Sequence, residues 1–530
     1  MTAKFLRAIE KRKTAGLACA AAGMLLLSGC NVGPKYAPPV PAAPPAFKES
    51  APAAYRSAPQ GTWQPAQPQD SLPKGKWWEV FNEPELNALE EQLNIDNQNI
   101  AQYFQNFMAA RAQVREARAG SYPTVTANPA FIRGGTAAKS TTTTAATTTG
   151  STSTGSTSTG ATSTSGGGSG SNYSLPVDVS WAPDLWGRIG NTVREYQYAA
   201  QVSAADLENE RLTEQAALAE YYFELRGQDE LQDVYNRTID ADRKSLELTR
   251  ALFETGITNE EAVAQADVTL KNAEAAGIGI ATNRALYEHA IATLIGKSAS
   301  TFSLPVKFLT TPVPAIPVGV PSQLLQRRPD IAAAERAMAQ ANALIGVEKA
   351  AYYPSLTLSA SGGLQSSAIS KLFSLPALFW SLGASASQIL FDAGLRNATV
   401  AQYTATYNAN VAAYQQTVLT AFQQVEDSIA TVRVLSQQIA KQNEAVQAAQ
   451  HYLDIATQRY QTGLDPYLDV ITAQNILLGD QQTMVTLRVS EMTAAAQLIQ
   501  ALGGGWDVTQ LPTPAQVAAK EAPSQVTKTP

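Results

Sequence analysis

Four stretches of the chain alternate apolar and polar residues with a period of two, which predicts β-strands with one apolar and one polar face. The polar face carries mainly Ser, Thr and Gly, and aromatic residues lie near the ends of the stretches. This pattern is typical of strands that cross a membrane in a barrel, although a soluble sandwich with one wet face would also produce it. The apolar positions are Val125, Ala127 and Phe131; Leu175, Val177, Val179 and Trp181; Leu356, Leu358 and Ala360; and Trp380, Leu382, Ala384 and Ala386.

The remaining long stretches have helical periodicity. Eight of ten positions spaced by three and four residues from Leu468 to Ile499 are apolar, which predicts a left-handed coiled-coil seam. The seam positions are 468, 471, 475, 478, 482, 485, 489, 492, 496 and 499. Residues 189–253 contain no proline, and as one helix they would extend on the order of 100 Å. A helix of that length indicates a molecule that spans a compartment.

The sequence repeats itself. Phe253-Glu-Thr-Gly256-Ile recurs 207 residues later as Tyr460-Gln-Thr-Gly463-Leu, and other pairs recur in the same order. Upstream pairs are 231 residues apart, and the offset changes across the tract 136–171, which consists almost wholly of Thr, Ser, Gly and Ala. We interpret that tract as a long loop inserted into the first copy. The predicted organisation is a first repeat at 77–300, a linker at 301–320, a second repeat at 321–503 and a C-terminal tail at 504–530.

The first residues form an export signal. A basic segment is followed by an apolar stretch that ends at Leu27 and is too short to span a bilayer, so residues 1–29 are predicted to be a signal peptide. The sequence Leu27-Ser28-Gly29-Cys30 resembles the lipobox of bacterial lipoproteins, which implies N-palmitoyl and S-diacylglycerol groups on Cys30. Asn31 favours sorting to the outer membrane. An ordinary signal peptide with an incidental cysteine is the alternative. Residues 30–76 are rich in proline, which predicts an extended spacer that adds nothing to a core.

Composition argues against several other classes of protein. Only 16% of residues are charged and the net charge is -6 with no basic run, which disfavours nucleic-acid binding. Two histidines and two cysteines leave little for a zinc site or a Cys–His pair, so neither a cofactor nor a metal is expected. Glu260-Glu261 fits a turn better than a catalytic pair, and we predict that the chain is not an enzyme. A lipid-anchored cell-wall hydrolase and a fibrous adhesin are the alternatives, which a conductance measurement would separate from a channel.

The number of strands predicts an oligomer. Four strands cannot close a barrel, and an open edge in lipid leaves backbone groups without partners. Two copies would give a narrow barrel filled with side chains, whereas three would give twelve strands and room for water. Hydroxyl-rich inner faces favour the water-filled arrangement.

An ordered set of motifs resembles the TolC-like outer-membrane efflux factors, in their lipoprotein branch. The resemblance covers nearly the whole mature chain and implies a mainly α protein with a membrane β-barrel. In this arrangement a homotrimer forms a twelve-strand barrel that continues into a coiled-coil helical barrel in the periplasm. It also implies a passive exit duct for drugs or other small molecules, which serves a periplasmic adaptor and an inner-membrane transporter of the resistance-nodulation-division (RND) type. The motifs are Gly33-Pro34-Lys35-Tyr36, Trp77-Trp78-Glu-Val-Phe81, Arg327-Arg328-Pro329-Asp330, Leu390-Phe391-Asp392-Ala-Gly394, Tyr460-Gln-Thr-Gly463 and Leu502-Gly503-Gly504-Gly505-Trp506.

The same resemblance places two turns at the periplasmic tips, where the tunnel closes. Gly256 and Gly463 occupy matching turns, with Glu260 after the first and Asp465 and Asp469 after the second. The family usually has an aspartate at both tips, but the position that matches Asp469 is Ala262. Three copies of Asp469 near the axis would form one acidic ring that favours cations and binds divalent ions. The alternative is that Asp469 only faces solvent or caps the helix that starts near Pro466.

The resemblance also places the tract 136–171 between the first two strands at the cell surface. Its composition predicts a neutral, unstructured loop, with a receptor or adhesin role as the alternative.

Overall fold

The computed structural model describes residues 31–38, 44, 46–49, 76–135, 169–309, 311–316 and 321–519. The predicted signal peptide, Cys30 and residues 136–168 of the predicted loop lie outside this range. The chain divides into two compact units. The strand unit comprises residues 31–33, Glu116–Asn191 and Gly346–Val400. The helix unit comprises Pro34–Arg115, Thr192–Ile345 and residues 401–519.

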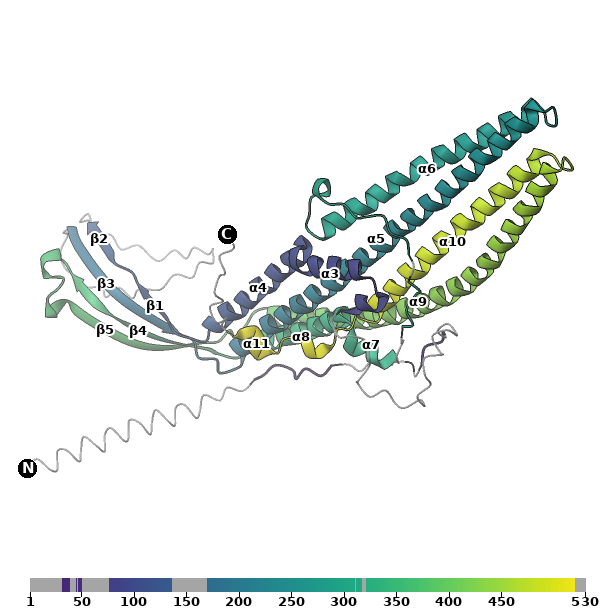
Figure 1. The fold of residues 1–530 in the computed structure, drawn as a ribbon. Coiled ribbons are helices and arrows are strands. Elements are labelled where there is room, and N and C mark those ends of the chain that lie inside the picture. Colours follow the sequence, from purple (N-terminus) through teal and green to yellow (C-terminus); the bar gives the residue numbers. More distant parts are fainter. Residues whose placement is uncertain are drawn as a thin grey trace, which may run out of the picture. The chain divides into compact units, whose positions relative to one another are not determined.

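The strand unit is one antiparallel sheet in the order β1-β3-β4-β5, with β2 also paired to β3 (Figure 1). Pro129 has no N–H to give to the ladder and separates β1 from β2, so the two form one strand path along β3. The four strands predicted from the alternation are therefore present. The prediction that the loop extends to residue 171 is wrong, because residues 169–171 already pair with β2. The strands are β1 (Thr124–Ala127), β2 (Ala130–Gly135), β3 (Ser169–Trp181), β4 (Ser355–Ser366) and β5 (Leu378–Ser387).

The register places residues of one kind in rows across the sheet. Directly paired residues lie on the same face of a sheet, so the ladder alone assigns the faces. One row is apolar and joins Val125, Val179, Ala360 and Leu382 from β1 to β5. The neighbouring row is polar and joins Thr126, Asp178, Ser361 and Ser381. The sheet therefore has one apolar face and one polar, hydroxyl-rich face.

Two pairs of matched helices dominate the helix unit. α5 and α9 contain 67 residues each, while α6 and α10 contain 35 each, so the two halves of the chain form equivalent hairpins. The predicted uninterrupted helix over 189–253 is confirmed. In the described parts of the chain, no helix combines the length and the apolar character needed to cross a bilayer. The helices are α3 (Pro84–Asp96), α4 (Gln98–Ala119), α5 (Arg188–Glu254), α6 (Glu260–Leu294), α7 (Pro321–Arg327), α8 (Pro329–Ala350), α9 (Leu395–Gln461), α10 (Tyr467–Ala501) and α11 (Pro514–Ala518), with short 3₁₀ turns at Trp77–Phe81, Ala299–Thr301, Ile369–Lys371, Leu375–Ala377 and Val508–Gln510.

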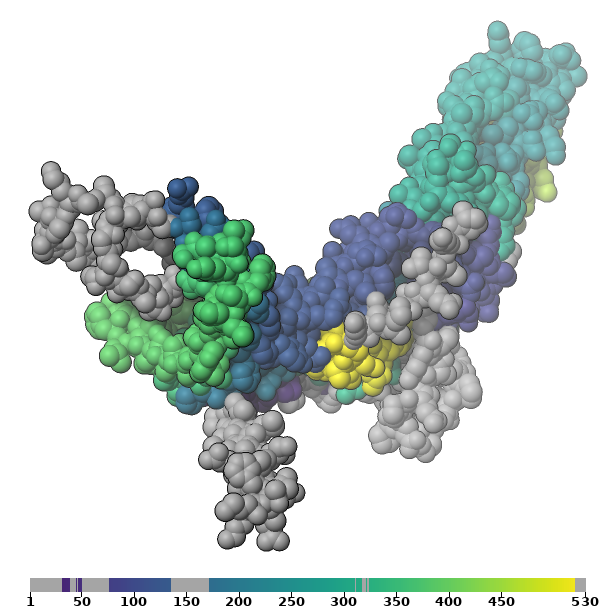
Figure 2. All heavy atoms as spheres, turned by 90° about the vertical axis from the view of Figure 1, so that its left-hand side faces the viewer, coloured from purple at the N-terminus to yellow at the C-terminus, as the bar shows by residue number. Residues whose placement is uncertain are grey.

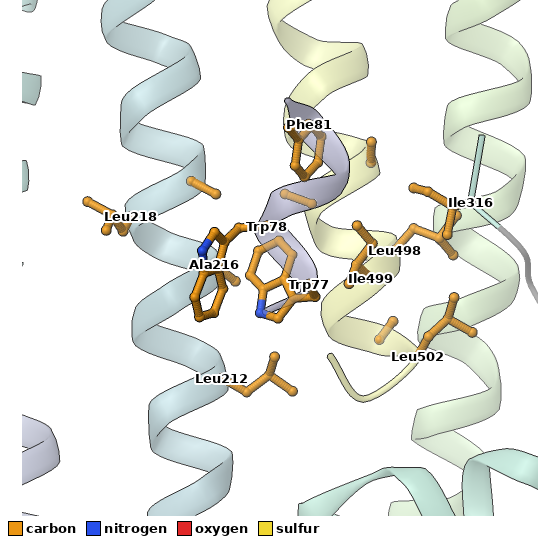
Figure 3. Packing of buried hydrophobic residues seen from close by; sticks show 14 of the residues in the cluster. Trp77, Trp78, Phe81, Leu212, Ala216, Leu218, Ile316, Leu498, Ile499 and Leu502 are labelled. Atoms are coloured by element: carbon orange, nitrogen blue, oxygen red, sulfur yellow. The ribbon is translucent and has the colours of Figure 1, made fainter. Parts of the chain in front are cut away.

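The largest core cluster forms around the 3₁₀ turn Trp77–Phe81 (Figure 3). Trp77 and Trp78 are buried between α5 and α10, where Leu212 and Leu498 belong to the same cluster. The indole N–H of Trp77 donates to Gln215 Oε1 at 3.1 Å, which satisfies its polar atom inside the core. This turn ties the hairpin of the first repeat to that of the second.

The predicted seam on α10 is correct only in its second half. Val485, Val489, Met492, Ala496 and Ile499 are buried as expected. Nearer the start of the helix, however, the buried residues are Tyr467, Val470, Ala473 and Leu477, each one or two positions before the predicted ones, and Leu468 is 57% exposed. Both stripes are mainly apolar in this region, with Asn475 as the one polar residue of the predicted stripe, so spacing alone could not distinguish them.

Segments predicted as linker, tail and spacer also contribute to packing. Leu304 and Ile316 of the linker are buried in the main cluster, and Tyr36 and Phe47 of the proline-rich segment pack against it. In the tail, Trp506 is buried, and Val517 packs with Val114 of α4. Figure 2 shows this yellow C-terminal segment directly beside the blue α4. The expectation that the spacer adds nothing to the core is therefore wrong for Tyr36 and Phe47.

Candidate functional site at the helix-hairpin tips

The two turns predicted as tips have the same backbone structure. Gly256 and Gly463 have φ of 74° and 75°, a left-handed conformation that L side chains rarely adopt. The N–H of Gly256 donates to Phe253 O and that of Ile257 to Leu252 O, and the equivalent bonds recur after Tyr460. These are the paired bonds of a Schellman motif, which satisfies the last carbonyls of α5 and α9. The glycines stop both long helices at the matching repeat position.

The returning helices begin differently at the two tips. Asn259 caps α6, because its side chain accepts a hydrogen bond from Ala262 N at 3.0 Å. Pro466 precedes α10 and provides no side-chain cap. Glu260 lies in the first turn of α6 and Asp469 in the first turn of α10, where each carboxylate is favoured by the helix dipole.

The second tip carries an ion pair that the sequence analysis did not identify. Arg459 Nη2 donates to Asp465 Oδ1 at 2.9 Å across the turn, and Arg459 Nε also contacts this carboxylate. The guanidinium holds the pKa of Asp465 below its usual value. Asp465 is therefore tied to its own hairpin, whereas Asp469 is half-buried one turn further along α10.

Tyrosines join the two hairpins just behind the tips. Tyr460 and Tyr467 lie with ring centroids 5.2 Å apart in a cluster that also contains Ala262 and Leu270 of α6. Tyr467 donates to Ser245 Oγ at 3.1 Å, so α10 is bonded to α5. A groove of about 630 Å³ lies between the two turns, lined in part by Gly256, Asn259, Gly463, Asp465 and Leu468. All five residues predicted for the tips, Gly256, Glu260, Gly463, Asp465 and Asp469, thus belong to two adjacent turns.

A buried carboxyl lies one turn before this tyrosine contact. Asp242 of α5 is 3% exposed, and its Oδ1 has no hydrogen-bond partner among the described residues. Burial disfavours the charged form and raises the pKa of Asp242 to about 6. No local sequence signal marks it, because an acid in a long polar helix is expected to face solvent.

The polar face of the sheet is the second candidate surface. Ser361 of β4 donates to Asp178 Oδ1 of β3 at 2.6 Å, within the polar row described above. Thr126 and Ser381 continue that row to the outer strands. A continuous hydroxyl and carboxylate surface of this kind suits contact with water.

The comparison with known families agrees with this geometry. The family described as "Outer membrane efflux protein" matches residues 89–297 and 320–504 of this chain. These are the two halves that contain the equivalent hairpins. The chain belongs to this family. Outer membrane efflux proteins of known structure share its fold: the solved outer-membrane channel OprN superimposes with a TM-score of 0.77 at 27% identity, covering 90% of this chain and 100% of that one. The fold class predicted from the sequence is therefore confirmed.

Relatives of known role are also outer-membrane efflux proteins. Antibiotic efflux pump outer membrane protein ArpC of Pseudomonas putida is 29% identical over 503 residues, covering 93% of this chain and 96% of that protein. Toluene efflux pump outer membrane protein TtgC, also of Pseudomonas putida, is 29% identical over 499 residues, covering 93% of this chain and 96% of that protein. This efflux protein is therefore an outer-membrane channel component of an efflux pump. Within the described ranges, no cluster of three or more His, Cys, Asp or Glu side chains could hold a metal ion.

Proposed function

We propose that three copies of this efflux protein form one channel, in which three four-strand sheets close a twelve-strand barrel. The observation that carries the proposal is the state of the sheet's two edges. In the described sheet, the β1–β2 path pairs only with β3, and β5 pairs only with β4. Unpaired edges in lipid cost several kcal/mol for each orphaned backbone group, so neighbouring copies must supply the missing strands.

The faces of the sheet define the inside of such a barrel. The apolar row through Val179 and Leu382 faces lipid, and the polar row through Asp178 and Ser361 faces a water-filled interior. A hydrated lumen passes small molecules without chemical change. The protein therefore acts as a passive exit duct and not as an enzyme, and it needs no cofactor or metal.

The tips form the resting closure of the duct on the periplasmic side. The matching turns at Gly256 and Gly463 line one groove, and the Arg459–Asp465 pair stiffens the second turn. Asp469, in the first turn of α10, supplies one acidic ring at the closure, while Ala262 supplies none.

The partners follow from the role of an outer-membrane efflux component. A duct in one membrane cannot use energy by itself, so a periplasmic adaptor and an inner-membrane transporter of the RND type complete the pump. The cargo is of the class that the relatives' names give, antibiotics and small apolar solvents such as toluene. Lipid on Cys30, as N-palmitoyl and S-diacylglycerol groups, anchors the N-terminus in the outer membrane in addition to the strands.

Deletion and complementation in the native host test the duct. Loss of the protein should raise intracellular accumulation of a fluorescent apolar efflux substrate several-fold, and the parent gene should restore the low level. Complementation by a Gly463→Pro variant with a broken tip should fail if its outer-membrane level equals that of the parent. Unchanged accumulation after deletion, with no other duct induced, would contradict the proposed function.

A further inference from the structure

A groove of about 330 Å³ lies in the strand unit, where β3 leads into α5 and β4 begins. Its volume falls in the range of about 300–1,000 Å³ that ligand pockets occupy. Trp186 and Tyr353 line it and stack with ring centroids 4.8 Å apart and an interplanar angle of 22°. Trp186 Nε1 donates to Pro354 O at 2.8 Å, so the polar atom of the indole is already satisfied. Leu185, Ile189, Leu356 and Ile389 supply further apolar walls.

The residue that follows Cys30 is held beside this groove. Asn31 Oδ1 accepts a hydrogen bond at 2.9 Å from Asn191 Nδ2, whose residue is only 3% exposed. Val32 N donates to the backbone oxygen of Trp186, a residue that lines the groove. These contacts hold residues 31 and 32 in a defined position beside the groove.

Two glycines, Gly187 and Gly346, leave the space that Asn31 and Asn191 occupy. Gly187 has a φ of 76°, and a Cβ on it would lie 3.1 Å from Asn31 Cα and 3.0 Å from Asn31 Oδ1. A Cβ on Gly346 would lie 2.6 Å from Asn191 Nδ2. Both positions need a residue without a side chain, because the N-terminal segment and its asparagine partner occupy the space.

We propose that one acyl chain of the lipid on Cys30 occupies this groove. The inference rests on the proposed lipidation of Cys30. Consecutive Cα atoms are about 3.8 Å apart, so an acyl chain attached at Cys30 starts within one residue of Asn31. Val32, the next residue along, is bonded to the backbone oxygen of Trp186. Apolar walls remove the methylene groups of the acyl chain from water, as the bilayer would, while the Asn191–Asn31 bond holds the residue next to its point of attachment. The acyl chain thereby packs as part of the folded strand unit, and the lipid does more than attach the N-terminal segment to the membrane.

Photo-crosslinking of the full-length protein tests this placement. Cells are grown with a diazirine-bearing palmitate, and the purified channel is irradiated, digested and analysed by mass spectrometry. The expected product is a cross-link that joins the Cys30 peptide to a peptide within residues 182–189 or 350–356. Because the anchor is covalently bound to Cys30, a bilayer lipid in the groove would instead give an adduct of free lipid mass, and this product alone would overturn the inference.

The remaining outcomes separate the two proposals. A Cys30 peptide that carries the fatty acid without any cross-link to the groove would overturn the inference and leave lipidation standing. A Cys30 peptide without the fatty acid would overturn the proposed lipidation itself.

A groove-filling variant provides an independent measurement. Ala351 lines the groove, so Ala351→Trp should reduce the cross-link yield at least tenfold while the Cys30 peptide remains lipidated. Ala398→Trp, at an exposed position of the same unit, should leave the yield unchanged. Equal cross-link yields in Ala351→Trp and the parent would contradict the proposed position of the acyl chain.

Discussion

At the scale of single residues, the burial of the Asp242 carboxyl predicts that the stability of the helix unit depends on pH. Its pKa is about 6 in the folded protein and close to 3.9 in an unfolded chain, so the folded state binds more protons between these values. The free energy of unfolding therefore falls as the pH rises from about 4 to 6. The full loss, caused by charging the buried Asp242 carboxyl, is present above about pH 6. By linkage this cost is on the order of 3 kcal/mol at neutral pH.

Asp242→Asn should remove that cost. We expect the helix unit of the variant to gain up to about 3 kcal/mol at pH 8 and nothing at pH 4, measured by hydrogen exchange of α5 amides. Asp240→Asn is the matched control, because the Asp240 side chain is 69% exposed. A gain of equal size at both pH values would show that Asp242 acts through packing and not through its charge.

The proposed ring of Asp469 carboxylates predicts an effect on ion flow through the channel. An acidic ring at a constriction attracts divalent cations, so Asp469→Ala should weaken block by periplasmic Mg²⁺ and reduce cation preference in planar-bilayer recordings. Asp454→Ala, an exposed position on α9, should leave both unchanged. If the block and the reversal potential of Asp469→Ala match those of the parent, Asp469 does not line the constriction.

Sequence reasoning located the tip glycines and the acids beside them, but neither the pairing of Asp465 with Arg459 nor the burial of Asp242. Gly256 and Gly463 stand in matching repeats, and a glycine that ends a long helix has a recognisable pattern. The Arg459–Asp465 pair spans six residues across a turn, and the burial of Asp242 depends on a helix distant in sequence. The burial of Asp242 has no local signature, because tertiary packing creates it. The Arg459–Asp465 pair depends on how the turn folds back, which the spacing of the two residues does not reveal.

At the scale of elements, the two faces of the sheet respond differently to the same substitution. Val177 lies in an apolar row with Gly362 and Trp380, so Val177→Lys should cost roughly 2–4 kcal/mol near the middle of the bilayer. Ser381→Lys, on the polar row, should fold like the parent. Heat-resistance of the folded band in detergent electrophoresis provides the readout, and equal loss in both variants would contradict the assignment of the faces.

Strands were predictable because their period of two is fixed by the backbone, and the register followed the alternation closely. The seam of α10 was only half predictable. Leu468 and Tyr467 are neighbours and both apolar, and the choice between them depends on contacts with Ala262 and Leu270 of α6. Helix periodicity fixes the spacing of a stripe, but the partner helix selects which stripe is buried.

At the scale of the whole molecule, the tandem repeat was visible in the sequence, as the equal lengths of α5 and α9 confirm. The packing of Tyr36, Phe47 and Trp506 was not, since isolated aromatics in a proline-rich or terminal segment carry no periodicity. In a single copy, the backbone groups at the two edges of the described sheet have no strand to pair with. They require that folding of the barrel and assembly of the copies occur together.

Dissociation should therefore unfold the sheet. In mild detergent the protein should behave as a trimer in light scattering, and conditions that yield a monomer should also abolish its β signal in circular dichroism. A stable monomer that keeps the β signal would show that the sheet edges are satisfied within one copy.

The central claim is that three copies form a water-filled duct closed at its tips, and single-channel recording of the purified trimer tests it most directly. The parent should insert as one unit with low conductance, and Asp465→Ala, which releases Arg459 at the second tip, should raise the open probability. The Ser381→Lys channel should keep the same tip behaviour while its ion selectivity shifts toward anions. Absence of any ion conductance from folded trimers of the parent and of Asp465→Ala would contradict the account.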